Sequence, residues 1–436
     1  MKRRSLFTLA AALPAFPLLG SLGACATVPD PKVASPAEPI GTGDLGVVIE
    51  RARGTLAIVD TTQRRVLAEV PGLGDLSHAS VVFSRDGRFA YVFGRDGGLT
   101  QVNLLTQRIV ARVMQAGNAI GGAISADGTL VAAQNYTPGG VKVFDARTLA
   151  LVADIPAWYG PGSEDSPERR AAPSSGESTL GGAGAAGDGG LKRSRVVGLV
   201  DLPGRRFAFS LFDADAIWIA DLSQDPTRPQ LTQLPGIGRQ PYDALVTPDG
   251  RHYIAGLFGE DGLALVDLWE PQPRVRRILN GYGRGQQPLP VYKMPHLRGW
   301  AVAGRHAYLP AIGRHEVLVV DTSTWQEVGR IPVAGQPVFV IARPDGRQVW
   351  VNFAVPDYHR VQVIDTPSQR VIDTLEPGKA VLHLEFSPRG EQVWISCRDD
   401  QRVVVYDTQR RAPLATLALD APSGIFFTAR AARMGF

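Results

Sequence analysis

The sequence predicts an all-β fold, an eight-bladed β-propeller, and two repeating features carry this prediction. A strand pattern that ends in an acidic or amide residue recurs eight times along the 436 residues. A glycine turn precedes many of the copies, and a turn with a further strand follows them. Four short strands in a unit of about 43 residues are typical of a propeller blade. No segment carries a convincing helical period.

The eight strand copies are evenly spaced, with one exception. They end at Asp60, Asn103, Asp145, Asp221, Asp267, Asp321, Asp365 and Asp407. The spacings are 43, 42, 76, 46, 54, 44 and 42 residues. Eight units predict eight blades, and seven blades are the alternative if the terminal copy is degenerate.

The turns and the two ends of the repeat region agree with this fold. "SRDGR" (84–88) and "TPDGR" (247–251) suit tight hairpins, because glycine accepts a positive φ and the carboxylate bonds its own backbone. The first repeat strand, "LGVVIERARG", and the last segment, "SGIFFTARAARMGF", are expected to pair in one blade. Such pairing closes the ring and removes exposed sheet edges.

The single long spacing is explained by an insertion at 159–192. This stretch is rich in Gly, Ala and Ser and has almost no core-forming residues. We expect it to be a disordered surface loop.

The N-terminal segment predicts an exported, membrane-anchored protein. Residues 1–25 have a basic start, an apolar run and small residues before Cys25, the layout of a signal peptide. "LGAC" resembles a lipobox, so Cys25 is the expected lipidation site, 26–40 a flexible tether, and 41–436 a single propeller domain in the periplasm. An uncleaved anchor is the alternative, although the apolar run is short for a membrane span. Both the general secretory route and the twin-arginine route stay open.

Charge and cysteine content exclude some classes of function. The formal charge is +4, and loss of the three basic residues of the signal leaves about +1, so the pI of 9.1 gives no support for nucleic-acid binding. Apart from Cys25 the chain has only Cys397, which lies in a strand pattern and is expected to be a packed thiol. Two glycine motifs, 41–46 and 182–187, match G-x-G-x-x-G but lack the strand and helix that a dinucleotide site needs, so we expect no NAD. No Cys-x-x-Cys-His motif is present, which excludes covalent c-type haem.

Large polar residues recur near the start of the innermost strand of several blades. Counted back from the residue before the turn glycine, His78 and Arg195 lie eight positions back, Tyr242 and His296 seven, and His383 six. We expect these side chains to surround a ligand on the propeller axis, while a purely structural role is the alternative.

Basic residues beside this set indicate the chemistry of that ligand. Arg239 and Gln240 lie next to Tyr242, and Arg284 and Lys293 precede His296. Guanidinium groups bind carboxylates in a bidentate manner, so we expect a flat ligand with several carboxylates. A histidine below such a ligand is the natural axial ligand of a metallo-tetrapyrrole.

The stretch around His78, "SHASVVFSRDGRFAYVFGRDGGLTQVNLL", resembles the haem d1 domain of cytochrome cd1 nitrite reductases. "PVYKMPHLRGW", "GRHEVLVVDT", "AGQPVFVIARPDGRQVWVNFA" and "SGIFFTARAARMGF" are more similar to the NirF family of haem d1 biosynthesis proteins. The resemblance covers residues 41–436 except the low-complexity loop. It implies that His78 is the axial ligand of the iron of haem d1 or a precursor, bound non-covalently.

The same resemblance argues against nitrite reduction. The chain has no cytochrome c domain, and the distal histidine pair falls near Arg343 and Gln287. We therefore expect a late step of haem d1 biosynthesis for nitrite reductase, in denitrification. Arg195, Arg239, Arg284 and Lys293 would then bind carboxylates of the haem d1 precursor. Tyr242, His296 and His383 would act as proton donors above the ring, and Asp201 would orient one of them.

Two other functions stay open at this point. One is a non-catalytic carrier that delivers haem d1 to cytochrome cd1 nitrite reductase, and the other is a propeller scaffold without cofactor. If the protein is an enzyme, it modifies a haem d1 precursor in an oxidoreductase-like step. Expected partners are the tetrapyrrole, other proteins of the pathway and a second copy in a homodimer.

Overall fold

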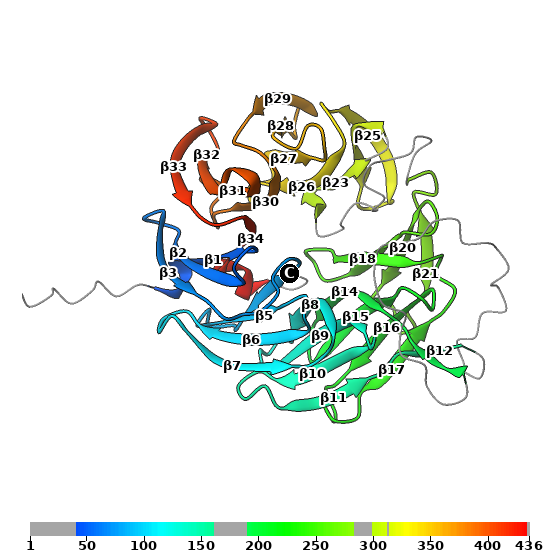
Figure 1. The fold of residues 1–436 in the computed structure, drawn as a ribbon. Helices are drawn as coiled ribbons and strands as arrows, with labels where there is room; N and C mark the ends of the chain where they lie inside the picture. Colours follow the sequence, from blue (N-terminus) through cyan, green and yellow to red (C-terminus); the bar gives the residue numbers. More distant parts are fainter. Residues whose placement is uncertain (1–40, 161–189, 283–298, 312–313, 434–436) are drawn as a thin grey trace, which may run out of the picture. The chain divides into compact units, whose positions relative to one another are not determined.

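The computed structural model describes residues 41–160, 190–282, 299–311 and 314–433. Contacts divide the chain into two units, 1–39 and 40–436, and all described residues belong to the second. In these ranges the strands form eight four-stranded antiparallel sheets and one two-stranded sheet. The eight sheets are the blades of a β-propeller arranged around a central axis (Figure 1), so the predicted fold and blade number are confirmed.

The innermost strands of the blades line the axis. They are β34 (Pro422–Phe427), β4 (Ser80–Phe83), β8 (Asn118–Ile124), β14 (Val196–Leu202), β18 (Pro241–Val246), β22 (Ala301–Ala303), β26 (Pro337–Ala342) and β30 (Val381–Phe386). Each of the last seven begins its blade in chain order, so these strands run in one direction along the axis.

The second strand of each blade follows a hairpin turn and is almost fully buried. The second strands are β1 (Leu45–Glu50), β5 (Phe89–Phe93), β9 (Leu130–Thr137), β15 (Arg206–Leu211), β19 (His252–Leu257), β23 (His306–Ala311), β27 (Gln348–Phe353) and β31 (Gln392–Cys397). Their apolar side chains pack between neighbouring blades and form the core clusters.

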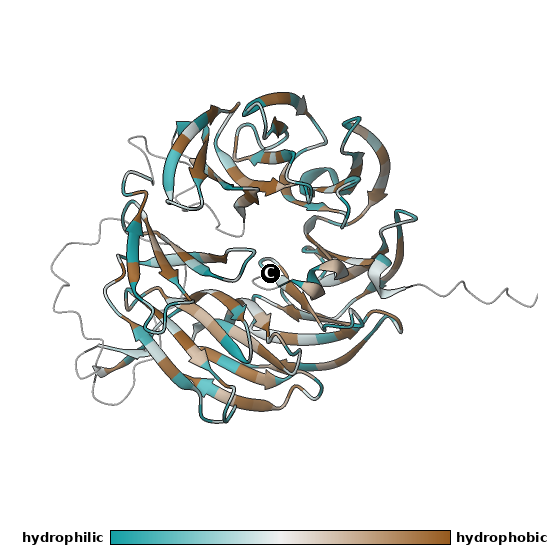
Figure 2. Ribbon diagram, turned by 180° about the vertical axis from the view of Figure 1, so that it is seen from behind, coloured by the Kyte–Doolittle hydropathy of each residue, from teal (hydrophilic) through white to brown (hydrophobic). Residues whose placement is uncertain are grey.

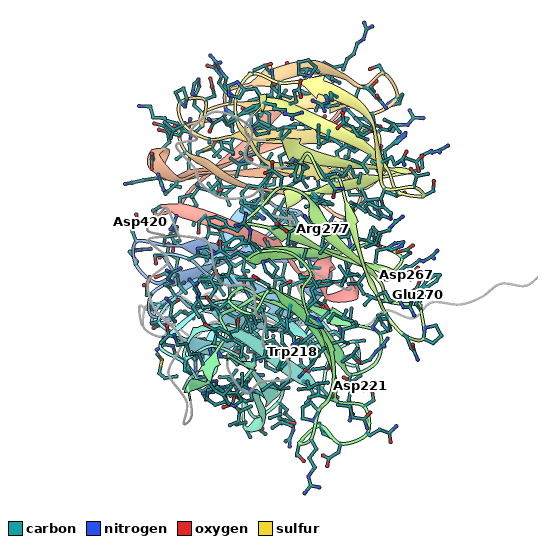
Figure 3. The ribbon with its side chains drawn as sticks, turned by 90° about the vertical axis from the view of Figure 1, so that its right-hand side faces the viewer. Trp218, Asp221, Asp267, Glu270, Arg277 and Asp420 are labelled. Atoms are coloured by element: carbon teal, nitrogen blue, oxygen red, sulfur yellow. The ribbon has the colours of Figure 1, made fainter. Side chains whose placement is uncertain are left out.

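The third strands carry the repeat motif. They are β2 (Thr55–Asp60), β6 (Gly98–Asn103), β10 (Val141–Asp145), β16 (Ala216–Asp221), β20 (Leu263–Asp267), β24 (Glu316–Asp321), β28 (Val361–Asp365) and β32 (Arg402–Asp407). The final carboxylate or amide of each accepts backbone N–H groups of the turn that follows, as Asp60 does from Thr62 and Gln63. The recurring acidic residue is therefore a turn cap; Asp221 and Asp267 are labelled in Figure 3.

The outermost strands have mostly exposed and half-buried side chains. They are β3 (Arg65–Val70), β7 (Arg108–Met114), β11 (Leu151–Ile155), β17 (Gln230–Leu234), β21 (Val275–Ile278), β25 (Gln326–Pro332), β29 (Arg370–Leu375) and β33 (Ala412–Ala418). Figure 2 shows brown apolar segments running through the strands, with teal polar segments at many turns. This exposure is expected of strands that have one side in contact with solvent.

The ring is closed by pairing of the chain's two ends. β34 pairs with β1, so this blade, which we call the closing blade, contains the last strand and the first three. The 3-10 helix η6 (Thr428–Ala432) follows β34, and the Thr428 hydroxyl donates to the carbonyls of Thr42, in η1 (Thr42–Asp44), and of Leu45. The expected pairing of the first and last segments is confirmed.

The insertion is structured at its base. β12 (Trp158–Tyr159) pairs with β13 (Lys192–Arg193), so both ends of the predicted disordered range 159–192 form a small sheet. Tyr159 is buried there, which explains the pairing. The rest of the loop, 161–189, lies outside the described residues.

A third 3-10 helix, η5 (Arg398–Asp400), follows β31.

Candidate functional site

His78 lies in a bend two residues before β4, at the end of the axis where the innermost strands begin. We call this the His78 end, and the opposite end, where these strands finish, the Asp201 end. His78 is partly buried. The structure therefore places this histidine near the axis, at the end that the turn alignment predicts.

The backbone before His78 is held firmly. Leu73 and Leu76 are each 1% exposed and anchor the segment in the core between two blades. The Asp75 carboxylate accepts from the Ser77 amide at 2.8 Å, and the Asp75 carbonyl accepts from the Arg95 amide at 2.7 Å. Burial opposes ionisation of Asp75, but the hydrogen bonds from Ser77 and the nearby arginine charges outweigh it and lower the pKa of this carboxyl.

Six innermost strands carry a register shift near the His78 end: β8, β14, β18, β26, β30 and β34. A bulge frees an amide and turns a side chain out of the regular alternation. Buried side chains accept hydrogen bonds from the freed amides, at 2.8–2.9 Å. Gln134 accepts from the amide of Leu199, Asn352 from that of Phe339 and Ser396 from that of His383. These bulges aim half-buried residues of the strands toward the axis.

His383 in β30 is such a residue, and one of its ring nitrogens is hydrogen-bonded within the protein. Its Nδ1 accepts the amide of Ile425 at 3.2 Å, so the imidazole proton sits on Nε2. Its ring packs against Phe426 at 5.5 Å and Phe339 at 6.3 Å between centroids. Burial and the charge of Arg430 lower the pKa of His383 to about 3. At neutral pH it is a neutral hydrogen-bond donor, which corrects its predicted role as a proton donor in acid–base chemistry.

Tyr242 does not have the exposure expected of an axial residue. It is 3% exposed and packs between blades against Phe212 and Phe258, with ring centroids 6.2 and 5.8 Å away. Burial raises its pKa. Its neighbour Asp243 is the half-buried residue of β18. Side chains alternate between the two faces of a strand. Tyr242 lies seven positions back from the residue before the turn glycine, so it is on the other face from residues that lie an even number of positions back.

Arg195 precedes β14 at the His78 end, but its guanidinium is already engaged. Nη2 lies 2.6 Å from an Asp213 oxygen, and Cζ lies 4.3 Å from the centre of the Phe212 ring. Burial would lower the pKa of Arg195, but the hydrogen bonds and charge of Asp213 raise it overall. This pairing corrects the expectation that Arg195 is free to bind a carboxylate of the ligand.

Arg239 and Gln240 are both exposed, just before β18. The Arg239 side chain is 62% exposed, with Nε 3.6 Å from Glu260. The Gln240 backbone adopts a φ of 51°, and its amide donates to Asp215 at 2.8 Å. Arg239 is only loosely paired, which leaves it available to a ligand.

Asp201 lies at the other end of the axis, 1% exposed at the end of β14. Its carboxylate accepts from Arg85 at 3.0 Å. Arg85 also donates to the carbonyls of Ile124, Ser125 and Ala431 at 2.8–3.2 Å, so it joins three blades to η6. The prediction that Asp201 orients a proton donor is wrong, because Asp201 binds Arg85 at the end opposite His78.

Four predicted residues lie outside the described residues: Cys25, Arg284, Lys293 and His296. Cys397 is fully buried, and burial raises the pKa of its thiol to about 12. This burial fits the expected packed thiol.

The His78 end contains buried polar atoms that have no hydrogen-bond partner in the described part of the chain. They are Ser80 Oγ, Asn118 Oδ1 and Gln336 Oε1. Each lies at or next to the start of an innermost strand. An unsatisfied buried polar group is costly, so three of them at one end of the axis fit a polar, multifunctional ligand.

The alignment from sequence missed several residues at this end. Arg95 lies 6.0 Å from the centre of the Tyr136 ring, and Asp243 and Phe339 are half-buried in bulged strands. Asp243 and Phe339 are found when only residues an even number of positions before the turn are considered. Like His383, each lies six positions back from the residue before the turn glycine. No sequence signal marks Tyr136, because it lies in a second strand.

Comparison with known proteins agrees with these features. Residues 40–431 match the family model of the cytochrome D1 heme domain. "Protein NirF" of Stutzerimonas stutzeri is 58% identical over 395 residues, covering 91% of this chain and 94% of that protein, and "Protein NirF" of Pseudomonas aeruginosa has the same identity and coverage. The "Dihydro-heme d1 dehydrogenase" of P. aeruginosa is 27% identical over 91% of this chain and 74% of its own length.

Solved structures show the same architecture. The structure of dihydro-heme d1 dehydrogenase NirN in complex with DHE matches with a TM-score of 0.73 and 25% identity, over 93% of this chain and 80% of that one. Apo AztD from Citrobacter koseri, 10% identical with a TM-score of 0.57 over 87% and 96% of the two chains, shares the fold alone. The chain belongs to the cytochrome d1 haem domain family and, within it, to the NirF proteins.

Proposed function

We propose that this protein binds a haem d1 precursor on the propeller axis and takes part in a late step of haem d1 biosynthesis for nitrite reductase. The observation that carries the proposal is the His78 end, which holds a partly buried histidine and several buried polar atoms without a hydrogen-bond partner in the described part of the chain. The relative NirN, whose solved structure is a complex with DHE, supports a tetrapyrrole as the ligand.

The residues at the His78 end fit such a ligand. His78 would hold the iron of such a ligand through an imidazole nitrogen, and the ligand would be bound non-covalently. Phe339 offers an apolar contact to the macrocycle, and the Nε2–H of neutral His383 donates a hydrogen bond to a ring substituent. The Ser80 hydroxyl is available to a peripheral oxygen. Arg239 binds a carboxylate near the rim, with Arg284 and Lys293 proposed for the same task from the sequence.

A titration of purified protein with haem d1 tests this proposal. We expect a shift of the Soret band in the wild type that is saturable at one equivalent. A variant with His78→Ala is expected to lose the shift while it keeps the melting temperature of the wild type. Identical spectra for free haem d1 and the mixture would refute the proposal and favour the cofactor-free scaffold.

A second candidate function, a carrier that delivers haem d1 to cytochrome cd1 nitrite reductase, is favoured by a specific observation. In the described ranges, the predicted proton donors are unsuited to acid–base chemistry, since Tyr242 is buried between blades and His383 is neutral with Nδ1 occupied. His296 is the remaining candidate. A variant with His296→Ala that binds haem d1 normally but abolishes haem d1 formation supports catalysis, whereas a carrier keeps haem d1 formation whenever binding is intact.

We also propose that the protein is a periplasmic lipoprotein anchored through Cys25. No helix in the described ranges is long and apolar enough to cross a membrane. Cell fractionation is expected to find the wild type with membranes and the Cys25→Ala variant in the soluble periplasmic fraction. Equal membrane association of both proteins would refute the lipid anchor.

A further inference from the structure

Phe426, in β34, contacts both His383 of the candidate site and Arg430 of η6. The centre of its ring lies 5.5 Å from that of the His383 imidazole, with 33° between the ring planes. The guanidinium carbon of Arg430 lies over the same phenyl ring, 5.0 Å from its centre. A cation is attracted to the face of an aromatic ring. Phe426 therefore links His383 to an arginine that follows the last strand, at the Asp201 end of the axis.

Arg430 is held in place by a buried carboxylate. Its Nε donates to one oxygen of Glu385 at 2.7 Å, and its Nη2 donates to the other oxygen. The Glu385 side chain is 9% exposed and that of Arg430 is 20% exposed. A bidentate pair fixes the plane of the guanidinium group as well as its position. Because Glu385 lies two residues after His383 in β30, the strand that carries His383 also anchors Arg430.

β34 holds the His383 ring at a second point. The amide of Ile425, the residue before Phe426, donates to Nδ1 of His383 at 3.2 Å, and Ile425 is fully buried. With Nδ1 as the acceptor, a neutral imidazole carries its proton on Nε2. Two consecutive residues of β34 thus set the orientation of His383, one through its backbone and one through its ring.

Arg251 shows what the same contacts do elsewhere in the molecule. It precedes β19, pairs with Asp267 at 2.6 Å, and its guanidinium carbon lies 5.4 Å from the ring centre of Trp269. Trp269 is 63% exposed, so this arrangement fixes a side chain on the surface. Phe426 is 8% exposed, and the imidazole that it contacts belongs to a half-buried residue of an innermost strand. The place of Phe426, rather than the ion pair itself, connects Arg430 to the candidate site.

We infer that Arg430 is a positioning residue of the axial site: through Phe426 it holds His383 in the orientation in which Nε2–H can donate a hydrogen bond to the ligand. The inference rests on the proposed function, because it takes the axial tetrapyrrole as the acceptor of that hydrogen bond. Arg430 acts from η6 at the Asp201 end and does not touch the ligand itself. The last segment of the chain then has two roles, since it closes the ring and orients a residue of the ligand site.

The first measurement observes the His383 ring directly and needs no ligand. The chain has seven histidines, and long-range ¹H–¹⁵N NMR spectra of their side chains distinguish the two neutral tautomers, with His383→Asn to assign the signal. At pH 7 we expect the Nε2–H tautomer alone in the wild type and a mixture of both tautomers in Arg430→Gln. Arg430→Lys keeps the cation and is expected to restore the wild-type signal. Arg251→Gln is the matched control and is expected to leave the His383 signal unchanged.

The second measurement relates this signal to binding. We expect Arg430→Gln to weaken binding of haem d1 by about threefold to tenfold, the range for one neutral hydrogen bond, while Arg430→Lys and Arg251→Gln bind as the wild type does. Phe426→Leu keeps the pair of Arg430 with Glu385 but removes the ring, and we expect the same two changes from it. It takes the place of Arg430→Gln if that variant does not fold.

The outcomes separate the inference from the proposed function. An unchanged His383 signal in Arg430→Gln and Phe426→Leu would overturn the inference, even with a lower affinity for haem d1, because Arg430 would then act by another route. A changed signal with wild-type affinity would overturn it as well, since the orientation of His383 would not matter to the ligand. Absence of binding by the wild-type protein refutes the proposed function, whereas the spectra of the free protein still test the link between Arg430 and His383.

Discussion

The two ends of the propeller axis are built by the same eight strands, yet the polar groups of the innermost strands are bonded differently at the two ends. At the Asp201 end, one guanidinium, that of Arg85, satisfies the buried Asp201 carboxylate and the last carbonyls of neighbouring strands and of η6. At the His78 end, polar atoms of Ser80, Asn118 and Gln336 are buried without a hydrogen-bond partner among the residues that the structure describes.

We infer from this difference that residues at one end of each blade serve stability and residues at the other end serve ligand binding. A closed, fully bonded polar network stabilises a fold, whereas unsatisfied polar groups cost free energy until a ligand meets them. We therefore expect the Asp201 end to stabilise the propeller and the His78 end to bind the ligand. Substitutions at the two ends are expected to affect different measurements.

The largest effect on stability is expected from Asp201→Ala. Removal of the carboxylate leaves the partly buried Arg85 without its counter-charge, and breaking a buried ion pair typically costs about 3–5 kcal/mol. Urea unfolding measures this loss, and haem d1 binding is expected to be unchanged at a temperature where the variant is folded. Arg205→Gln, which removes an exposed pair with Asp127, is the control and is expected to cost less than about 1 kcal/mol. Loss of haem d1 formation by an Asp201→Ala protein of normal stability would contradict the structural role.

The second effect is a pH dependence from His383. Its pKa in the folded state, about 3, lies below the ordinary value of 6.5, so between these values the unfolded chain takes up a proton that the folded chain does not. The contribution to stability is complete above pH 6.5 and is lost as the pH falls toward 3, by on the order of 1 kcal/mol per pH unit.

Unfolding of wild type and His383→Asn at pH 7, 6, 5 and 4 measures this contribution. Asparagine keeps an acceptor for the Ile425 amide but cannot be protonated in this range, so we expect a shallower acid slope for the variant. Parallel pH profiles would show that His383 is not held neutral.

The smallest effect compares two buried hydroxyl groups. Tyr253 donates to the Gly198 carbonyl at 2.9 Å, while the Ser80 hydroxyl has no partner in the described ranges. Tyr253→Phe is expected to cost about 1 kcal/mol in the free energy of unfolding, and Ser80→Ala close to nothing. Haem d1 affinity is expected to fall only in Ser80→Ala. A stability loss as large for Ser80→Ala as for Tyr253→Phe would remove Ser80 from the candidate site.

The sequence predicts the fold well because each blade repeats its own local signals. Residues such as Asp60 and Asp321 cap turns in every copy, so the blade number follows from counting. Side-chain partners were not predictable in the same way. The pairing of Arg85 with Asp201 spans 116 residues, and Arg195 meets Asp213 only after two strands fold together.

The error at Tyr242 has a physical cause. A shift of one residue moves a side chain to the other face of its strand, and a bulge between Pro241 and Ala244 changes the count further. That Asp243 and Phe339 belong to the candidate site can be predicted only when the positions of these bulges are known. His78 lies before the regular part of β4. The alternation of side chains along that strand therefore does not determine which way His78 points, and an error of one residue in the alignment has less effect there.

The central claim is that the His78 end binds an iron tetrapyrrole through His78 itself. The most direct measurement is the electronic absorption spectrum of haem d1 bound to wild-type protein and to His78→Gly, with and without added imidazole. The account predicts that the variant loses the axial-ligand spectrum and that imidazole, which can enter the space left by the side chain, restores it. A wild-type spectrum from His78→Gly without imidazole would contradict the account, because another residue would then hold the iron.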